Sequence, residues 1–177
     1  MQIAALQVQT PLGEMLALAS DDGLCALDFG GSASLQRRLR RWFPPHQIVD
    51  AEIPVLRRTR DWLSAYFDGA IGELDDIPLD LRGAPFELRV WAALREIPPG
   101  RTSSYGEIAK QLGAPRACRA VGAANGANPV SIIVPCHRVI GSSGALIGYG
   151  GGLDRKRWLL DHEAWIYSSL SAAIGST

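Results

Sequence analysis

The chain has 177 residues, of which 47% are hydrophobic and 20% are charged, with a formal net charge of zero. This balance is typical of soluble globular proteins, and the length predicts one domain or two small ones. No apolar run approaches the roughly 18 residues needed to cross a bilayer, and no basic segment precedes an apolar one at the N-terminus, so we expect a cytoplasmic location.

The zero net charge conceals an asymmetry between the two halves of the chain. Residues 1–83 contain 8 Lys/Arg and 12 Asp/Glu, a difference of −4, whereas residues 84–164 contain 10 Lys/Arg and 6 Asp/Glu, a difference of +4. A basic half joined to an acidic half is expected where one face meets phosphate. We therefore expect an N-terminal domain with a linker (1–83), a C-terminal domain (84–164) and a tail (165–177).

The three cysteines, Cys25, Cys118 and Cys136, are odd in number and widely spaced, which gives no disulfide framework and favours a reducing compartment. No CxxC or HxxxH pair is present, so a structural zinc site is not supported and we expect no metal.

The first half predicts an antiparallel meander with helices after it. Apolar and polar residues alternate in three short runs, and the sequences PLG and DDG supply the turns between them. A pair of prolines ends the first helix. The elements expected are strands at 3–9, 14–20 and 24–29, helices at 34–43 and 54–67, and a loop with an extended segment at 68–81.

The second half predicts a helix-turn-helix. A helix begins at Pro85 and runs to about Arg95. Ser104 with Glu107 three residues later is the capping-box pattern for a second helix, which runs to about Leu112. The sequence Gly-Ala-Pro then makes the turn into a third helix, at 116–126, rich in Ala and Gly. Small residues allow a helix to lie close to DNA, and they equally allow tight helix packing.

A β-like run at 130–134 leads into Pro135-Cys136-His137, and a Gly/Ser-rich turn follows at 141–144. A thiol is a strong nucleophile once ionised, but its ordinary pKa of about 8.5 requires a group that takes its proton or stabilises its charge. The alternative reading of Cys136 is a buried structural thiol. A reactive thiol beside a DNA-reading element favours chemistry on DNA. The Ser/Ala-rich segment after Glu163 predicts a floppy tail.

Five motifs occur in order along the second half. They are Ser104-Tyr105-Gly106-Glu107-Ile108-Ala109, Arg119-Ala120-Val121-Gly122, Asn128-Pro129, Pro135-Cys136-His137-Arg138-Val139 and Gly148-Tyr149-Gly150-Gly151-Gly152-Leu153. Together they resemble the O6-alkylguanine-DNA alkyltransferases, which are suicidal DNA-repair proteins. The specific resemblance covers about residues 84–164, and the first 83 residues are similar in layout only.

The resemblance implies an α+β protein. Its N-terminal domain would be a ribonuclease-H-like α/β domain, and its C-terminal domain a winged-helix-like helical domain with a helix-turn-helix and the active-site motif. The implied activity is a single, irreversible transfer of the alkyl group from O6-alkylguanine in double-stranded DNA to Cys136. O4-alkylthymine stays open as a second substrate. The resemblance implies no cofactor, no membrane, no obligate protein partner and a monomer in the absence of DNA.

The resemblance also assigns roles to individual residues. The proton of the nucleophile would pass through water to His137, which Glu163 orients, while Tyr105 would donate a proton or hydrogen bond to the leaving guanine. Arg119 would enter the DNA stack in place of the extruded base, and Asn128 would rigidify the active-site motif. The catalytic set is Cys136, His137, Glu163, Tyr105 and Asn128. The DNA-binding set is Arg119, Tyr105, Ala120, Gly122, Ala123, Ser104 and Arg138. The substrate pocket is Pro135, Val139, Tyr149, Gly150, Gly151 and Ser131.

Three other functions stay open at this point. A lesion-binding protein without covalent chemistry would keep the DNA-binding motifs but lack the cysteine. A thiol hydrolase would turn over repeatedly without DNA and would need an oxyanion hole, which no motif indicates. A transcription regulator would need base-reading side chains, of which the Ala/Gly-rich helix offers few.

Overall fold

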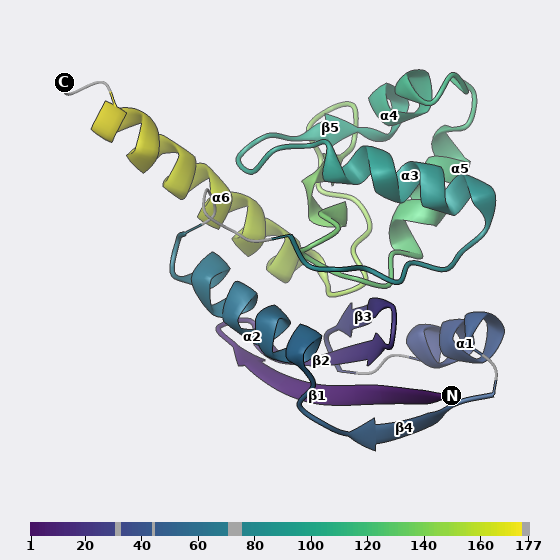
Figure 1. Cartoon of the computed structure of the whole chain (residues 1–177). Coiled ribbons are helices and arrows are strands. Elements are labelled where there is room, and N and C mark those ends of the chain that lie inside the picture. Colours follow the sequence, from purple (N-terminus) through teal and green to yellow (C-terminus); the bar gives the residue numbers. More distant parts are fainter. Residues whose placement is uncertain (31–32, 44, 71–75, 175–177) are drawn as a thin grey trace. The chain divides into compact units, whose positions relative to one another are not determined.

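The computed structural model describes residues 1–30, 33–43, 45–70 and 76–174, and the chain forms two compact units (Figure 1). The first unit contains Met1–Ala84 together with Pro129–Ser131. The second contains Pro85–Asn128 and the chain from Ile132 onward. The first combines a sheet with helices and the second is mainly helical, which confirms the expected α+β class.

The sheet of the first unit has four strands in the order β3-β2-β1-β4. Their bounds are β1 (Gln2–Thr10), β2 (Gly13–Ser20), β3 (Gly23–Asp28) and β4 (Gln47–Asp50). The first three strands pair antiparallel, which confirms the meander. Strand β4, which the sequence did not predict, adds to the edge parallel to β1 with Ile3 opposite Ile48.

Two helices accompany this sheet, α1 (Ala33–Trp42) and α2 (Pro54–Phe67). Helix α2 has the predicted bounds, because Pro54 stands in its first turn where a missing N–H costs nothing. Buried side chains of α1 pack on the sheet. The cluster is Ile3, Ala5, Leu18, Cys25, Ala26, Leu35, Leu39 and Phe43.

The described part of the segment after α2 returns to the sheet. Leu24 donates its N–H to Pro78 O (2.8 Å) and accepts from Asp80 N (2.9 Å). Gly23 is required at this approach, since a Cβ there would lie 2.6 Å from Pro78 O. The extended part of the predicted 68–81 segment is thus present, whereas residues 71–75 lie outside the described residues.

The second unit is built from helices around a very short parallel sheet (Figure 1). The helices are α3 (Pro85–Arg95), α4 (Tyr105–Gln111), α5 (Cys118–Gly126) and α6 (Leu153–Ile174), with a 3-10 helix, η2, at Cys136–Arg138. The strands are β5 (Ser103–Ser104) and β6 (Val139–Ile140). Helix α3 has its predicted bounds, and the indole N–H of Trp91 donates to Ala124 O of α5 at 2.9 Å.

The expected strand at 130–134 is wrong. Val130 forms only an isolated bridge with Leu27, within the first unit, and the next residues turn. Ile132 has φ 71, a conformation that a β-branched residue adopts only at a cost. The apolar run reflects burial of Val130, Ile132 and Val134 rather than strand geometry.

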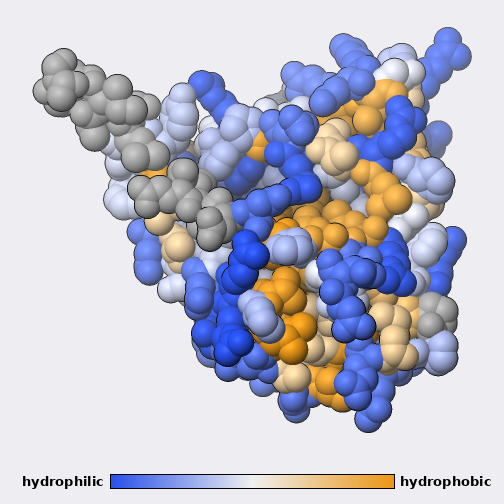
Figure 2. Space-filling model, in the orientation of Figure 1, coloured by the Kyte–Doolittle hydropathy of each residue, from blue (hydrophilic) through white to orange (hydrophobic). Residues whose placement is uncertain are grey.

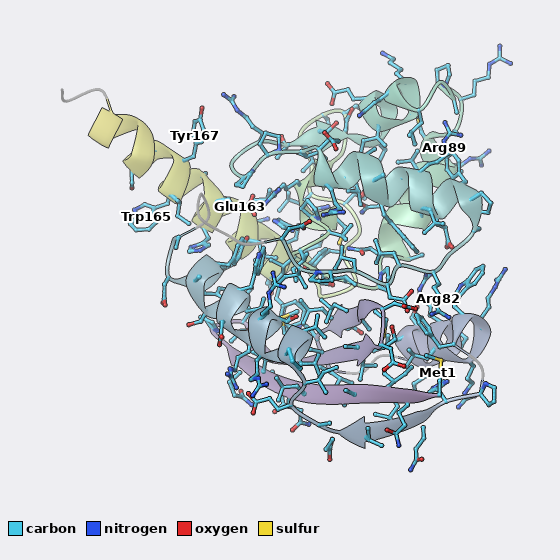
Figure 3. The ribbon with its side chains drawn as sticks, viewed as in Figure 1. Met1, Arg82, Arg89, Glu163, Trp165 and Tyr167 are labelled. Carbon is cyan, nitrogen blue, oxygen red and sulfur yellow. The ribbon has the colours of Figure 1, made fainter. Side chains whose placement is uncertain are left out.

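The expectation of a floppy tail is also wrong for residues 165–174, which continue α6 to Ile174 (Figure 1). Trp165 and Tyr167 project to different sides of this helix (Figure 3). Ile166 is buried, and the Tyr167 side chain packs against Gly100, where a Cβ would come within 2.9 Å of the Tyr167 Cβ. Packing on both residues holds the helix beyond Glu163.

The helices in the described ranges include none that is both long and apolar enough to span a bilayer. Hydrophilic side chains cover much of the face seen in Figure 2, and hydrophobic residues show between them in patches.

Candidate functional site

The candidate nucleophile lies on a tight turn of the second unit. Cys136 opens the 3-10 helix η2, its N–H donates to Val134 O (2.8 Å), and Arg138 N donates to Pro135 O (3.0 Å). The thiol side chain is 5% exposed. Burial raises the pKa of the Cys136 thiol, while a hydrogen bond from Asn128 and the positive charge of Lys156 counteract that rise. The buried thiol therefore needs help from its neighbours to ionise.

The end of helix α5 holds this turn through two amides. Asn128 donates Nδ2 to Val134 O at 2.7 Å, and Asn125 donates Nδ2 to Cys136 O at 3.4 Å. Asn128 therefore bonds the residue just before the motif at 135–139, and its role in catalysis stays a prediction. Asn125 is buried, with 4% of its surface exposed. It was not among the predicted site residues.

His137 and Glu163 form a buried pair. Nε2 of His137 lies 2.8 Å from Oε1 of Glu163, and both side chains are fully buried. Burial lowers the pKa of His137, which favours the neutral imidazole, and a bond from Nε2 to a carboxylate requires the proton on Nε2. Nδ1 of His137 has no hydrogen-bond partner among the described residues, which leaves a buried acceptor on the residue that follows Cys136. The predicted orienting contact between Glu163 and His137 is present in the structure.

Arg138 also lies inside the unit and not on its surface. It is 7% exposed, and its Nε and Nη2 donate to Oε2 and Oε1 of Glu163, both at 2.9 Å. The guanidinium is thus held within the unit, and the predicted DNA contact of Arg138 stays a prediction. Burial tends to raise the pKa of Glu163, but His137 and Arg138 outweigh it and hold the pKa well below its ordinary value.

Lys156 is a second buried cation that sequence reasoning missed. Its Nζ donates to the carbonyl oxygens of Val139 (2.6 Å), Ile147 (2.8 Å) and Gly148 (3.3 Å). Its side chain is fully buried, and burial lowers the pKa of the ammonium while the Cys136 thiolate raises it. Lys156 thus ties the start of the Gly-rich loop to β6 and brings a positive charge toward the nucleophile.

Tyr105 is brought toward this turn by the parallel pairing of β5 with β6, in which Ser103 faces Val139 and Ser104 faces Ile140. Tyr105 follows β5 directly as the first residue of α4. Its hydroxyl donates to Ile147 O at 3.1 Å, and burial, followed by the charge of Cys136, raises the pKa of the phenol.

The start of α4 shows the predicted capping box. The Ser104 hydroxyl accepts from Glu107 N (3.2 Å), and the Glu107 carboxylate accepts from Ser104 N (2.6 Å). Ser104 is therefore occupied as a helix cap, which fixes the direction in which Tyr105 leaves the strand.

The exposed surface of α5 carries most of the predicted DNA-binding residues. Arg119, Ala120 and Ala123 are exposed, whereas Val121, Ala124 and Asn125 face the core. Gly122 is half-buried, and a Cβ there would lie 3.8 Å from the Tyr105 ring. The helix begins at Cys118, two residues later than predicted. The exposed side chains of α5 are small apart from that of Arg119, so a flat or grooved partner can approach the helix closely.

The predicted pocket residues fall into three groups. Pro135 and Val139 are buried on either side of η2. Tyr149, Gly150 and Gly151 lie in the loop before α6, where Gly152 N donates to Tyr149 O at 3.0 Å. Ser131 belongs to the first unit, in which its N–H donates to Leu27 O at 2.9 Å. The structure therefore brings all but Ser131 into the unit that holds Cys136.

No group of three or more His, Cys, Asp or Glu side chains suited to a metal ion occurs in the described part of the chain. All three cysteines are free thiols, with Cys25 and Cys136 buried and Cys118 exposed.

These features define a class of protein: a helix-turn-helix unit whose second helix is tied by side-chain amides to a buried Cys–His–Glu site, joined to an α/β unit. Two family models match the chain in the same order. The ribonuclease-like domain of 6-O-methylguanine DNA methyltransferase matches residues 7–81, and the DNA binding domain of the same family matches residues 85–165.

Known proteins agree with this match. A methylated-DNA–protein-cysteine methyltransferase of Mycolicibacterium paratuberculosis is 67% identical over 101 residues, and one of Mycobacterium tuberculosis is 65% identical over 103 residues. These alignments cover 57% and 58% of this chain but only 61% and 62% of the relatives. Over the whole fold, a crystal structure of Mycobacterium tuberculosis OGT in complex with DNA is 44% identical, with a TM-score of 0.75 and 94% of each chain covered. A structure of the O6-methylguanine methyltransferase of the same organism gives a TM-score of 0.74, with 92% of this chain and 93% of that chain covered.

The chain belongs to the 6-O-methylguanine DNA methyltransferase family, and its first unit is the ribonuclease-like domain of that family.

Proposed function

We propose that the protein repairs DNA by direct reversal, transferring the alkyl group of O6-alkylguanine in double-stranded DNA to Cys136 in a single turnover. The observation that carries the proposal is the buried Cys136 on a turn held by the second helix of a helix-turn-helix, followed directly in the chain by His137 of the buried His137–Glu163 pair. Membership of the methyltransferase family and the DNA complex of a relative support DNA as the partner.

The chemical step is a displacement at the alkyl carbon. Cys136 Sγ forms a bond to that carbon, the bond from the carbon to O6 breaks, and its electrons pass to the guanine ring. The thiol proton passes through a bridging water to Nδ1 of neutral His137, while Nε2–H stays bound to Glu163. The products are S-alkyl-cysteine and, once a proton is taken up by a ring nitrogen, guanine. No cofactor takes part.

Tyr105 supplies that last proton, or a hydrogen bond in its place, to the leaving base. Its raised pKa keeps the phenol protonated at neutral pH, as a donor must be. In this structure the hydroxyl donates to Ile147 O, so it exchanges that carbonyl for the base when substrate binds. Asn128 acts by holding the Val134 carbonyl and bonding the thiol.

The exposed face of α5 meets the DNA. Ala120 and Ala123 permit close approach of the helix, and Arg119 fills the space left by an extruded base, which offsets part of a cost of a few kcal/mol. Gly122 lies against the Tyr105 ring, at a distance where an added Cβ would make an ordinary van der Waals contact (3.8 Å). Ser104 contributes as the cap that orients α4, and Arg138 is assigned to positioning within the site.

The proposed pocket for the base is formed by Pro135, Val139, Tyr149, Gly150 and Gly151 of the second unit. A thioether is a very poor leaving group, and no group in the proposed site removes the alkyl chain, so each molecule acts once. We further propose a cytoplasmic monomer that needs no protein partner, with O4-alkylthymine as the second substrate to be tried.

A Cys136→Ser variant tests the proposal. Equal amounts of variant and wild type are mixed with a duplex containing one O6-methylguanine, and both binding and restored guanine are measured. We expect the variant to bind the duplex without repairing it, while wild type restores one guanine per protein molecule. Repair by the variant, or repeated turnover by wild type, would contradict covalent transfer.

A further inference from the structure

The carboxylate of Glu163 accepts four hydrogen bonds within the second unit. Oε1 accepts from His137 Nε2 (2.8 Å) and Arg138 Nη2 (2.9 Å), and Oε2 accepts from Arg138 Nε (2.9 Å) and Gly100 N (3.3 Å). An ionised carboxylate has about four lone-pair positions. All of them are used, so the group is held in one orientation on α6 (Figure 3).

The charges in this cluster favour the neutral form of His137. Glu163 and Arg138 are both buried and form a two-pronged ion pair whose net charge is zero. A buried carboxylate facing a histidine alone would favour the imidazolium, because an unpaired buried charge is costly. With Arg138 in place that charge is already balanced, and the imidazole is left as a neutral donor.

We propose that Arg138 is a positioning residue for alkyl transfer: its guanidinium balances Glu163, so that His137 stays neutral, keeps its proton on Nε2 and presents Nδ1 to the thiol of Cys136. The inference rests on the proposed function. The acceptor Nδ1 is buried and without a partner among the described residues, as a base waiting for a proton requires.

Among the described residues, no other charged group around His137 balances the charge of Glu163 as Arg138 does. Lys156 on α6 is the only other buried cation among the described residues, and it is bound to three carbonyl oxygens. Cys136 precedes His137 on the same turn and is itself neutral as a thiol. The loop before β5 supplies only backbone groups to the cluster, Gly100 N to Glu163 and Ile97 O to Arg138.

The test is the pH dependence of methyl transfer from an O6-methylguanine duplex. The variants are Arg138→Gln, which removes the charge, and Arg138→Lys, which keeps it. Arg60→Gln is the matched control, since Arg60 also pairs with a glutamate, Glu52, but on the surface of the first unit. Rates are measured by single-turnover kinetics from pH 6 to pH 9.

We expect wild type and Arg60→Gln to share one profile, and Arg138→Lys to follow it closely. In Arg138→Gln the pKa of His137 rises, so the rate near neutral pH falls relative to the same variant's rate at alkaline pH. One unit of pKa corresponds to about a tenfold loss on the acidic side. Profiles of the same shape for Arg138→Gln and wild type overturn the proposal, while active wild type keeps the proposed function intact.

A measurement on wild type alone covers the case in which Arg138→Gln does not fold. In protein containing ¹⁵N-labelled histidine, the ring nitrogens of His137 report both charge and tautomer. We expect a neutral ring protonated on Nε2 at pH 7. An imidazolium, or a neutral ring protonated on Nδ1, overturns the role of Arg138 whatever the variant does.

Discussion

At the scale of single residues, the site depends on charged side chains that are buried and fully engaged. Glu163 accepts four hydrogen bonds and Lys156 donates to three carbonyls, yet neither side chain is exposed. Buried charges are tolerated only when their hydrogen-bonding capacity is met. Removing one member of such a cluster therefore leaves the remaining buried groups without a hydrogen-bond or charge partner.

Glu163→Gln is expected to destabilise the protein as well as slow it. The amide cannot neutralise Arg138, so a buried guanidinium is left unbalanced, and the free energy of unfolding should fall by about 3 kcal/mol. Urea unfolding measures this loss. Glu52→Gln removes an exposed, solvent-screened ion pair and should lower the free energy of unfolding far less. Equal effects of the two substitutions would mean that burial of Glu163 has no energetic consequence.

Lys156→Met tests the tether on the Gly-rich loop. The three carbonyls of Val139, Ile147 and Gly148 lose their donor, and the Cys136 thiolate loses a nearby positive charge. We expect methyl transfer to slow by about tenfold, which corresponds to about 1.4 kcal/mol, together with faster amide hydrogen exchange at Gly148 and Tyr149. Unchanged exchange would show that the loop is held by other contacts. Lys110→Met, on the exposed face of α4, is the control.

Sequence reasoning found the residues of the site whose chemistry can be read locally. Cys136 stood out because a thiol is a strong nucleophile once ionised, whereas the roles of His137 and Glu163 came from the family resemblance. Lys156, Asn125 and the true position of Arg138 were missed, since a Lys or Arg in sequence is most often solvated. Their burial depends on carbonyl and carboxylate partners 17 and 25 residues away, which only the tertiary fold reveals.

At the scale of elements, the two-residue pairing of β5 with β6 links the helix-turn-helix to the nucleophile. Strand β5 leads straight into α4, and β6 leaves η2 directly. The start of α4 is fixed by the reciprocal bonds of Ser104 and Glu107. A weaker cap should therefore loosen Tyr105 relative to the turn.

Ser104→Ala is expected to lower the free energy of unfolding by about 1 kcal/mol, because the Glu107 N–H loses its acceptor. The rate of methyl transfer should fall as well, since Tyr105 is the next residue. Ser168→Ala is the matched control, as its hydroxyl merely bonds Ala164 O on an exposed side of α6. Thermal unfolding and single-turnover rates of both variants measure these effects. Losses of stability and rate in Ser104→Ala that equal those in Ser168→Ala would contradict the prediction.

Helices were predicted best where proline marks their start. Pro54 and Pro85 each begin a helix at the predicted residue. The failures were elements decided by distant contacts. Val130 to Val134 has the composition of a strand but turns at Ile132, and α6 continues past Glu163 because Ile166 and Tyr167 find packing partners. Strand β4 is short and mostly exposed, so no alternation marked it.

At the scale of the whole molecule, the buried site makes stability depend on pH. Unfolded His137 binds a proton below about pH 6.5, whereas burial lowers the pKa of the folded imidazole. Glu163 has its pKa lowered in the folded protein and takes up a proton on unfolding below about pH 4.5. In both cases the unfolded chain binds more protons, so acid favours unfolding.

Urea unfolding between pH 8 and pH 4 is therefore expected to give a plateau above pH 7 and a decline below about pH 6.5. Each extra proton bound by the unfolded chain contributes about 1.4 kcal/mol per pH unit, and the decline steepens once Glu163 joins His137. A free energy of unfolding that stays constant from pH 7 to pH 5 would mean that His137 is not held neutral in the folded state.

The most direct test of the account is mass spectrometry of the intact protein and its peptides after mixing with O6-methylguanine duplex, with unmodified duplex as the control. We predict a gain of one methyl group per protein molecule, located on the peptide that contains Cys136 and dependent on the lesion. Binding without a gain in mass, or methyl groups on Cys118 or Cys25 in place of Cys136, would contradict it.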